Sequence, residues 1–177
     1  MRELLVLRHA KSSWDEIDAD DHDRKLSPRG IKAARRMGAL IAERGWLPDL
    51  ILCSTARRTR ETLALAQEAW PGTPAIPVSE VEGLYLAPAS RLLDIVRRQP
   101  DEAQRLMLIG HNPGLQALVT RLAGLGDKKL RAAIEIKFPT AALARITCDI
   151  GSWRDLGWNI GTLADYRTPA DPRSTAD

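Results

Sequence analysis

The sequence has few residues that bind metals or form disulfides: its 177 residues contain two cysteines and three histidines. Cys53 ends an apolar run and Cys148 lies in an alternating run, so both are predicted to be buried thiols in a reducing compartment. We therefore expect a cytoplasmic protein. Neither cysteine has the spacing of a zinc site, and three scattered histidines do not predict a His-rich metal centre.

Long apolar runs are also absent, since no run in the sequence approaches the ~20 residues that a membrane helix needs. The short apolar stretch at the N-terminus, "ELLVLR", leads directly into polar residues, which predicts a strand and not a signal peptide. The formal net charge is +3 and basic residues are mixed with acidic ones, so no nucleic-acid partner is predicted. We expect a globular protein with no membrane association.

Apolar segments alternate with amphipathic ones along the chain. This alternation predicts an α/β protein with a mainly parallel sheet and helices on both faces. One domain is expected over residues 1–167, followed by a polar, proline-containing and flexible tail over 168–177. Strands are predicted at 3–8, 49–53, 76–79 and 106–109, helices at 28–45, 54–70, 88–98 and from 113, and extended edge segments at 134–138, 142–148 and 158–166.

Two helix starts carry capping signals. Ser27 is a natural N-cap before Pro28, and Gly45 fits the end of the same helix. Asn112 is the predicted N-cap of a later helix whose first residue would be Pro113. The acidic stretch within residues 9–26 is expected to be a solvated loop.

Polar residues follow three of the predicted strands. Arg8 and His9 end the first, Ser54 follows the second, and Gly110 and His111 follow another. In parallel sheets, ligands bind at the carboxyl ends of strands, so these residues should converge on one crevice if their strands are neighbours.

The residue types at this edge suit an anion, above all a phosphoryl group. Guanidinium groups pair bidentately with phosphate oxygens, and Arg8 and the arginines of "STARRTRET" could supply them. A neutral imidazole can attack phosphorus. Neighbouring positive charges should lower a histidine pKa and keep the ring neutral, while a bound phosphate acts in the opposite direction.

Four segments resemble the motifs of the histidine phosphatase superfamily, which includes phosphoglycerate mutases. "LVLRHAKSSWD" is similar to its RHG signature with Ala10 in place of glycine, and "LSPRG" is similar to its LT/LS-x-x-G segment. "STARRTRET" matches S-x-x-x-R-x-x-x-T, and "GHNP" matches the second-histidine motif. These forms resemble most the SixA-type phosphohistidine phosphatase branch, and they span roughly residues 3–122.

The resemblance implies a three-layer α/β/α sandwich of the phosphoglycerate mutase type and a role for each matching residue. His9 would be the nucleophile that forms a phosphohistidine intermediate. Arg8 and Arg58 would hold the phosphoryl oxygens, and His111 would donate a hydrogen bond to the transferring group. No metal and no cofactor would be required.

Other polar residues near the motifs have less defined roles. Lys11, Ser12 and Arg24 are further candidates for binding substrate phosphate, and Trp14 either lines the entrance or packs the loop. The remaining residues are expected at the surface: Arg57 and Arg60 on solvated helix faces, and His22 within the acidic stretch.

Two departures from the wider family concern carboxylates. Asp15 stands where related enzymes often have an asparagine that helps to hold phosphate, so it either turns away or binds a cationic leaving group. Cleaving an alkyl phosphate requires a proton donor for the leaving oxygen. Glu82 is the candidate, with Glu80 as a competitor, whereas SixA-type enzymes lack this acid because the P–N bond of phosphohistidine is labile.

The leading prediction is a metal-independent phosphatase whose substrate is phosphorylated, with a phosphohistidine-carrying protein as the expected partner. A small-molecule phosphomonoesterase that uses Glu82 is the first alternative. A non-catalytic phosphate-binding module is the second. The sequence does not predict an oligomeric state.

Overall fold

The structure, a computed structural model, describes residues 1–72 and 74–171. These residues form one seven-stranded sheet with the order β3-β2-β4-β1-β6-β7-β5. The strands are β1 (Arg2–Arg8), β2 (Leu50–Ser54), β3 (Val78–Val81), β4 (Arg105–Gly110), β5 (Ala123–Gly126), β6 (Leu143–Cys148) and β7 (Gly161–Arg167). The predicted mainly parallel sheet is confirmed, with β6 antiparallel to both of its neighbours.

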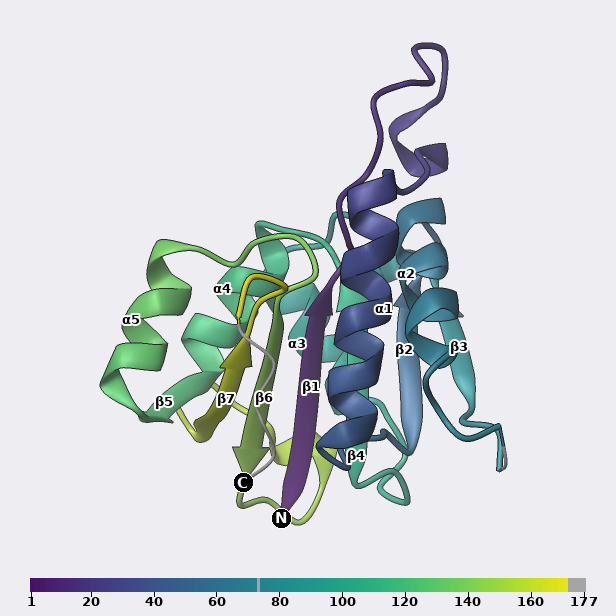
Figure 1. Ribbon diagram of the computed structural model, residues 1–177. Coiled ribbons are helices and arrows are strands. Elements are labelled where there is room, and N and C mark those ends of the chain that lie inside the picture. The colour runs from purple at the N-terminus through teal and green to yellow at the C-terminus, as the bar shows by residue number, and fades with distance from the viewer. Residues whose placement is uncertain (73, 172–177) are drawn as a thin grey trace.

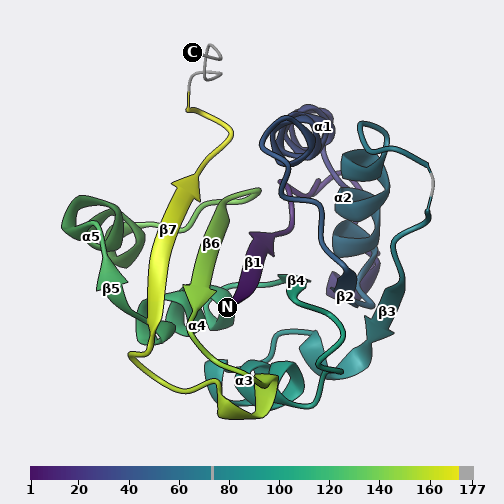
Figure 2. The ribbon, with the colours of Figure 1, turned by 90° about the horizontal axis from the view of Figure 1, so that it is seen from below.

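Helices cover both faces of this sheet, as the α/β/α prediction requires (Figures 1 and 2). In Figure 2 the pair α1 and α2 lies on one side of the sheet, and α3 and α4 lie on the other. The α-helices of the described residues are α1 (Pro28–Glu43), α2 (Arg57–Gln67), α3 (Ala89–Arg97), α4 (Gly114–Leu122) and α5 (Lys128–Ile136). No helix of the described residues is long and apolar enough to cross a membrane.

The central strand β1 divides the core in two. Leu4 and Val6 pack into the cluster under α3 and α4, while Leu5 and Leu7 pack into the cluster under α1 and α2. Successive side chains of a strand point to opposite faces, so a continuous apolar run is what a strand covered on both sides requires. This burial places Arg8, the last residue of β1, at the edge where the apolar layer ends.

Three strand ends meet at that edge. In the parallel register, Arg8 lies beside Gly110, and Cys53, which precedes Ser54, lies beside Ile109. Because β2, β4 and β1 are consecutive in the sheet, the predicted convergence of their carboxyl ends is observed. In Figure 1 the segment that follows β1 rises from this edge and extends beyond the helices.

The largest error of the sequence prediction is at residues 134–138, which were expected to be extended. The alternation in "IEI" is typical of a strand, but residues 134–136 are the last residues of helix α5, and the extended backbone begins at its C-cap, Lys137. Asp127 caps that helix by accepting hydrogen bonds from the N–H groups of Lys129 and Leu130. Leu130 and Ile134 lie four residues apart and pack towards the core, while Ile136 is exposed, so the helical period determines the structure here.

Two smaller differences concern the chain after β4. Helix α4 begins at Gly114, one residue later than predicted, with Pro113 at the N-cap position. Asn112 still contributes a capping bond, because its side chain accepts from the N–H of Gln116. The chain after α4 forms the short edge strand β5, which was not predicted, paired with β7.

The start of the predicted tail has specific contacts. The N–H of Thr168 donates to the carboxylate of Asp171, and the guanidinium of Arg36 donates to the Asp171 carbonyl. Residues 172–177 lie outside the described residues. The division into a domain at 1–167 and a flexible tail therefore stays a prediction.

Candidate active site

His9 lies directly beyond the end of β1 and is 7% exposed. Its backbone N–H donates to the carbonyl of Gly110 at 3.1 Å. Its Nδ1 lies 2.7 Å from the carbonyl oxygen of Ala10. A carbonyl can only accept, so Nδ1 carries the proton and the lone pair of the neutral ring is on Nε2. This tautomer is the one needed for attack by Nε2 on phosphorus.

The ring of His111 lies close to that of His9, with ring centroids 5.3 Å apart. Its Nδ1 lies 3.3 Å from Nη2 of Arg58, and its Nε2 lies 2.8 Å from Oγ of Ser54. Because a guanidinium can only donate, Nδ1 accepts and Nε2–H donates to Ser54. The expected hydrogen bond from His111 to a phosphoryl group therefore requires a proton on Nδ1, which a bound anion would favour.

The hydroxyl of Thr62 connects the nucleophile segment to the helix that carries Arg58. Thr62 Oγ1 accepts from the N–H of Ala10 at 2.9 Å and donates to the carbonyl of Arg58 at 2.7 Å. Arg58 is 4% exposed, and Thr62 ties its backbone to the segment that carries His9. All three motif residues of the "STARRTRET" segment thus contact the histidine segments. Ser54 and Arg58 contact His111, and Thr62 contacts the backbone next to His9.

Gly30 of the "LSPRG" motif and Gly114, which follows "GHNP", allow close backbone contacts around this edge. A Cβ on Gly30 would lie 2.1 Å from the carbonyl oxygen of Lys11, and one on Gly114 would lie 1.9 Å from that of Ala87. Real Cβ atoms do not approach backbone oxygen so closely, so no larger residue fits at either position. The helix starts of α1 and α4 can therefore pack directly against the loops that border the site.

Arg8 and the further candidates occupy different parts of the edge. Arg8 Nη1 donates to the carbonyl of Phe138 at 3.0 Å. Arg24 donates to Ser12 Oγ at 2.7 Å, and its guanidinium carbon lies 3.3 Å from the centroid of the Trp14 ring. Trp14 is 75% exposed and stacks on the guanidinium of Arg24.

The remaining predicted residues lie outside the contacts of the two histidines. The side chains of Lys11 and Glu82 are exposed, although Glu82 begins the 3-10 turn η2 (Glu82–Leu84) near the site. Arg57 and Arg60 form exposed ion pairs with Glu61 and Glu80, as expected for solvated helix faces.

The structure adds two residues that the sequence analysis missed, Asp21 and Tyr85. The Asp21 carboxylate lies 3.0 Å from Nη2 of Arg58 and accepts a hydrogen bond from the hydroxyl of Tyr85. The Asp21 carbonyl accepts from the other terminal nitrogen of Arg58 at 2.6 Å. The ring of Tyr85 packs edge-on against His111, with centroids 5.3 Å apart.

The acidic stretch is therefore a solvated loop except at the turn η1 (Asp21–Asp23), which reaches back to the site. No periodicity separates Asp21 from the other acidic residues of the stretch, so the sequence carried no signal for it. Asp15, the departure from the family pattern, is exposed. His22, expected at the surface, is half-buried beside Tyr85, with Nε2 3.0 Å from Oγ1 of Thr55.

Burial and positive neighbours lower the pKa of both site histidines. For His9, burial is the main cause, the charges of Arg58, Arg8 and Arg24 add to it, and the pKa falls to about 4 although the hydrogen bond to Ala10 opposes the shift. For His111, burial followed by the charge of Arg58 lowers the pKa to about 3. Both rings are therefore neutral at pH 7 in this ligand-free state.

Asp21, unlike the two neutral histidines, is charged at pH 7. Partial burial raises its pKa, but hydrogen bonds from Tyr85 and Arg58 outweigh this and lower the pKa to about 2. Asp21 is thus an anion in direct contact with the guanidinium that the resemblance assigns to phosphate.

Comparisons with known proteins agree with this geometry. A profile of the histidine phosphatase superfamily (branch 1) matches residues 4–85. A solved structure of a candidate phosphohistidine phosphatase SixA from Agrobacterium tumefaciens is 32% identical, with a TM-score of 0.79 over 95% of this chain and 98% of that chain. The chain belongs to the histidine phosphatase superfamily.

Further relatives extend the likeness over the whole fold. An uncharacterized chloroplastic protein of Arabidopsis thaliana is 36% identical over 176 residues, which cover 92% of this chain and 77% of that protein. A protein histidine phosphatase SixA complexed with tungstate is 20% identical, with a TM-score of 0.74 over 94% of this chain and 97% of that chain, and shows the shared fold. This member of the histidine phosphatase superfamily is SixA-like in its architecture.

The lowered histidine pKa values predict how this histidine phosphatase superfamily member responds to acid. The unfolded chain binds protons at both histidines below about pH 6.5, whereas the folded chain binds them only near pH 4 and pH 3. The free energy of unfolding should therefore decrease as the pH falls from 6.5 towards 4. Imidazole NMR titration of the ligand-free protein should show His9 and His111 neutral at pH 5.5, and titration of either near pH 6.5 would contradict this.

Asp21 should compete with inorganic phosphate for Arg58. In Asp21→Asn the side chain keeps its shape and loses its charge, so the inhibition constant of inorganic phosphate should fall by about three- to tenfold, as expected for one partly exposed ion pair. The matched control is Asp18→Asn, which removes the same charge from an exposed position of the same segment. An equal change in both variants, or weaker phosphate binding in Asp21→Asn, would disprove the competition.

Proposed function

We propose that this protein is a phosphatase that transfers a phosphoryl group to Nε2 of His9 and then hydrolyses the resulting phosphohistidine. The observation that carries the proposal is the His9 tautomer: the Nδ1–H bond to the Ala10 carbonyl leaves the Nε2 lone pair free in a site with three arginines nearby. Membership of the histidine phosphatase superfamily supports phosphatase activity.

In the first step, Nε2 of His9 forms a bond to phosphorus while the bond from phosphorus to the leaving group breaks. Arg8, Arg58 and Arg24 supply positive charge for the phosphoryl oxygens. In the second step, water attacks phosphorus, Nε2 leaves with its electron pair, and inorganic phosphate is released. The arginines supply the positive charge that a metal would otherwise bring, so the proposal includes no metal and no cofactor.

We further propose that the physiological substrate is phosphohistidine carried by a protein. A leaving alkoxide needs a proton from a general acid, and an acid is effective when its pKa lies near the working pH. With a pKa of about 2, Asp21 is a poor acid at pH 7, and the exposed Glu82 contacts neither histidine. A phosphohistidine substrate needs less assistance, because a ring protonated on its free nitrogen leaves as neutral imidazole. The cytoplasmic location stays part of this proposal.

The alternative is a small-molecule phosphomonoesterase that uses Glu82. One observation favours it: Val81, which precedes Glu82, pairs with Ser54 in the parallel register, so Glu82 lies at the catalytic edge of the sheet.

The variant Glu82→Gln distinguishes the phosphohistidine phosphatase from the phosphomonoesterase. Wild type and variant should differ by less than about tenfold in kcat/KM on a phosphohistidine protein and on an alkyl phosphate, since a general acid contributes about 10²–10⁴-fold. Glu80→Gln is the matched control from the same segment, with a carboxylate paired to Arg60. A loss of about 100-fold on the alkyl phosphate in Glu82→Gln alone would replace the phosphohistidine assignment with the phosphomonoesterase.

A further inference from the structure

A cavity borders the site on the side of β6 and β7, with a volume of about 500 Å³. It lies between the first turn of α1, the loop from α5 to β6, and the end of β7. The polar side chains that line it include Arg8, Lys11, Arg29, Lys137, Thr140 and Tyr166.

The charge of this cavity is of one sign. Lys11, Arg29 and Lys137 are exposed, and none of them forms an ion pair with a carboxylate of residues 1–72 or 74–171. The Tyr166 hydroxyl is already used, because it donates to the Lys137 carbonyl at 2.7 Å. The basic groups are therefore free to bind an anion from outside the described chain.

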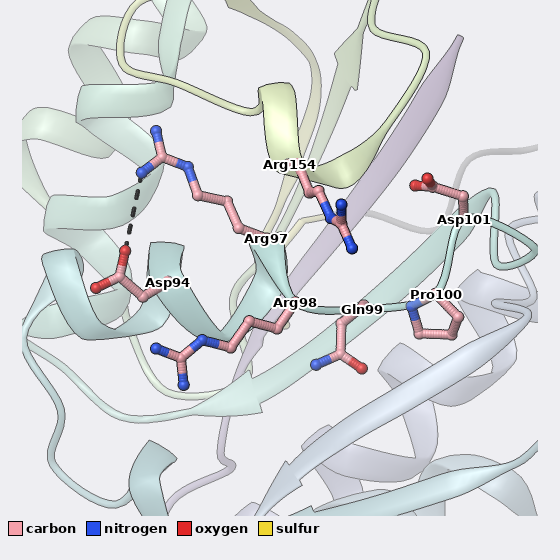
Figure 3. Close-up of a pocket in the computed structure, with 7 residues that line it drawn as sticks. All are labelled: Asp94, Arg97, Arg98, Gln99, Pro100, Asp101 and Arg154. Carbon is pink, nitrogen blue, oxygen red and sulfur yellow. Dashed lines mark ion pairs between the residues drawn. The ribbon is translucent and has the colours of Figure 1, made fainter.

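A cavity at the other end of the strands shows the contrast (Figure 3). Its volume is about 540 Å³ and it is lined by arginines together with Asp94 and Asp101. Asp94 pairs with Arg97 at 3.8 Å, and Asp101 pairs with Arg2 at 3.3 Å. Acidic and basic side chains are therefore mixed in that cavity, whereas no carboxylate of the described residues lines the cavity beside Arg8.

Arg8 connects the basic cavity with His9. Its guanidinium lines the cavity and donates to Phe138, and its charge also acts on His9. Because Arg8 is shared, one molecule can place a phosphoryl group at His9 and an anionic group near Lys11, Arg29 and Lys137.

We propose that this cavity binds the carboxylates of an acidic polypeptide segment next to the phosphorylated residue of the substrate. The proposal rests on the proposed function for its substrate class. The basic groups come from three separate segments around an open cavity, which suits several carboxylates spread along a chain. Trp14 and Ile17 are 75% and 92% exposed on the segment that rises from the same edge, and such apolar side chains favour a protein partner (Figure 1).

The test measures binding without catalysis. Two fluorescein-labelled, unphosphorylated peptides centred on histidine, one flanked by glutamates and one by glutamines, are titrated with the full-length protein, and anisotropy is recorded. Wild type should bind the glutamate peptide about fivefold or more tightly than the glutamine peptide. The double variant Arg29→Gln/Lys137→Gln should reduce that ratio to about one, if these cations provide the discrimination.

The matched control is Lys32→Gln/Lys128→Gln, which removes the same charge from exposed positions of α1 and α5 that do not line the cavity. It should keep the preference for glutamate. Equal binding of both peptides by wild type, or equal loss in the two double variants, would overturn the proposal. Pyrophosphate binding that depends on Arg29 and Lys137, without peptide binding, would also overturn it in favour of a small anion.

Catalysis is then measured on the phosphorylated peptides. A higher kcat/KM for the glutamate peptide, lost in Arg29→Gln/Lys137→Gln only, supports the proposal together with the phosphohistidine function. Preferential binding of the glutamate peptide with no hydrolysis of either peptide would reject the phosphohistidine function and leave the cavity assignment standing. The two failures are therefore distinguishable.

Discussion

His9→Ala should abolish phosphate release from every substrate that the wild type hydrolyses, with kcat reduced by at least about 10⁴-fold, as expected when a covalent nucleophile is removed. The reason is the lone pair on Nε2, which the Nδ1–H bond to Ala10 directs away from the backbone. Residual phosphate release within about tenfold of wild type would exclude His9 as the nucleophile.

The same residue can be tested by trapping the intermediate. Wild type mixed with a radiolabelled phosphohistidine substrate and quenched in alkali should carry label on His9, because P–N bonds are stable in alkali and labile in acid. His22→Ala should still be labelled and His9→Ala should not. Tight phosphate binding by wild type with no labelled protein would indicate a non-catalytic phosphate-binding module.

Arg58→Gln should produce the second largest loss. Arg58 is 4% exposed and its guanidinium contacts both His111 and Asp21, so it is the arginine best placed to bind the transferring phosphoryl group. We expect kcat to fall by about 10²–10³-fold, the usual effect of removing one preorganised donor to transition-state charge. Steady-state kinetics on the phosphohistidine protein measure it.

Control variants distinguish the loss of the Arg58 guanidinium from a general loss of charge or of folded structure. Arg60→Gln removes an exposed arginine of the same helix that pairs with Glu80, and its kcat should stay within about threefold of wild type. Arg58→Lys keeps the charge and loses the planar fork, so its kcat should lie between those of wild type and Arg58→Gln. Thermal unfolding of each variant monitors the fold, and an Arg58→Gln protein that is folded and fully active would disprove the assignment.

The site residues that directly follow a strand could be predicted from the sequence. His9 and His111 each follow a buried apolar run, and the carboxyl ends of parallel neighbours meet at one edge, so their proximity follows from the pattern. The motif match pointed to Arg58, which the first turn of α2 carries. Their chemical roles stay predictions that the variants above test.

Asp21 and Tyr85 were not predictable in the same way. Both lie in or next to short 3-10 turns, where no period indicates which side chain points inward. The helix α5 was missed for a related reason, since a three-residue alternation such as "IEI" fits a strand as well as the end of a helix. Local sequence patterns were therefore enough to locate the sheet edge. Tertiary contacts determine which side chains of the covering loops point towards it, and the sequence pattern does not show these contacts.

The contact between Asp21 and Arg58 has a consequence for product release. In the proposed cycle, inorganic phosphate leaves Arg58 only as fast as its bonds to the guanidinium break. The Asp21 carboxylate can replace those bonds as phosphate departs, because it already accepts from Arg58 in the ligand-free state. The acidic turn would thereby shorten the residence time of the product, at the cost of weaker binding of the phosphoryl group at the start of each cycle.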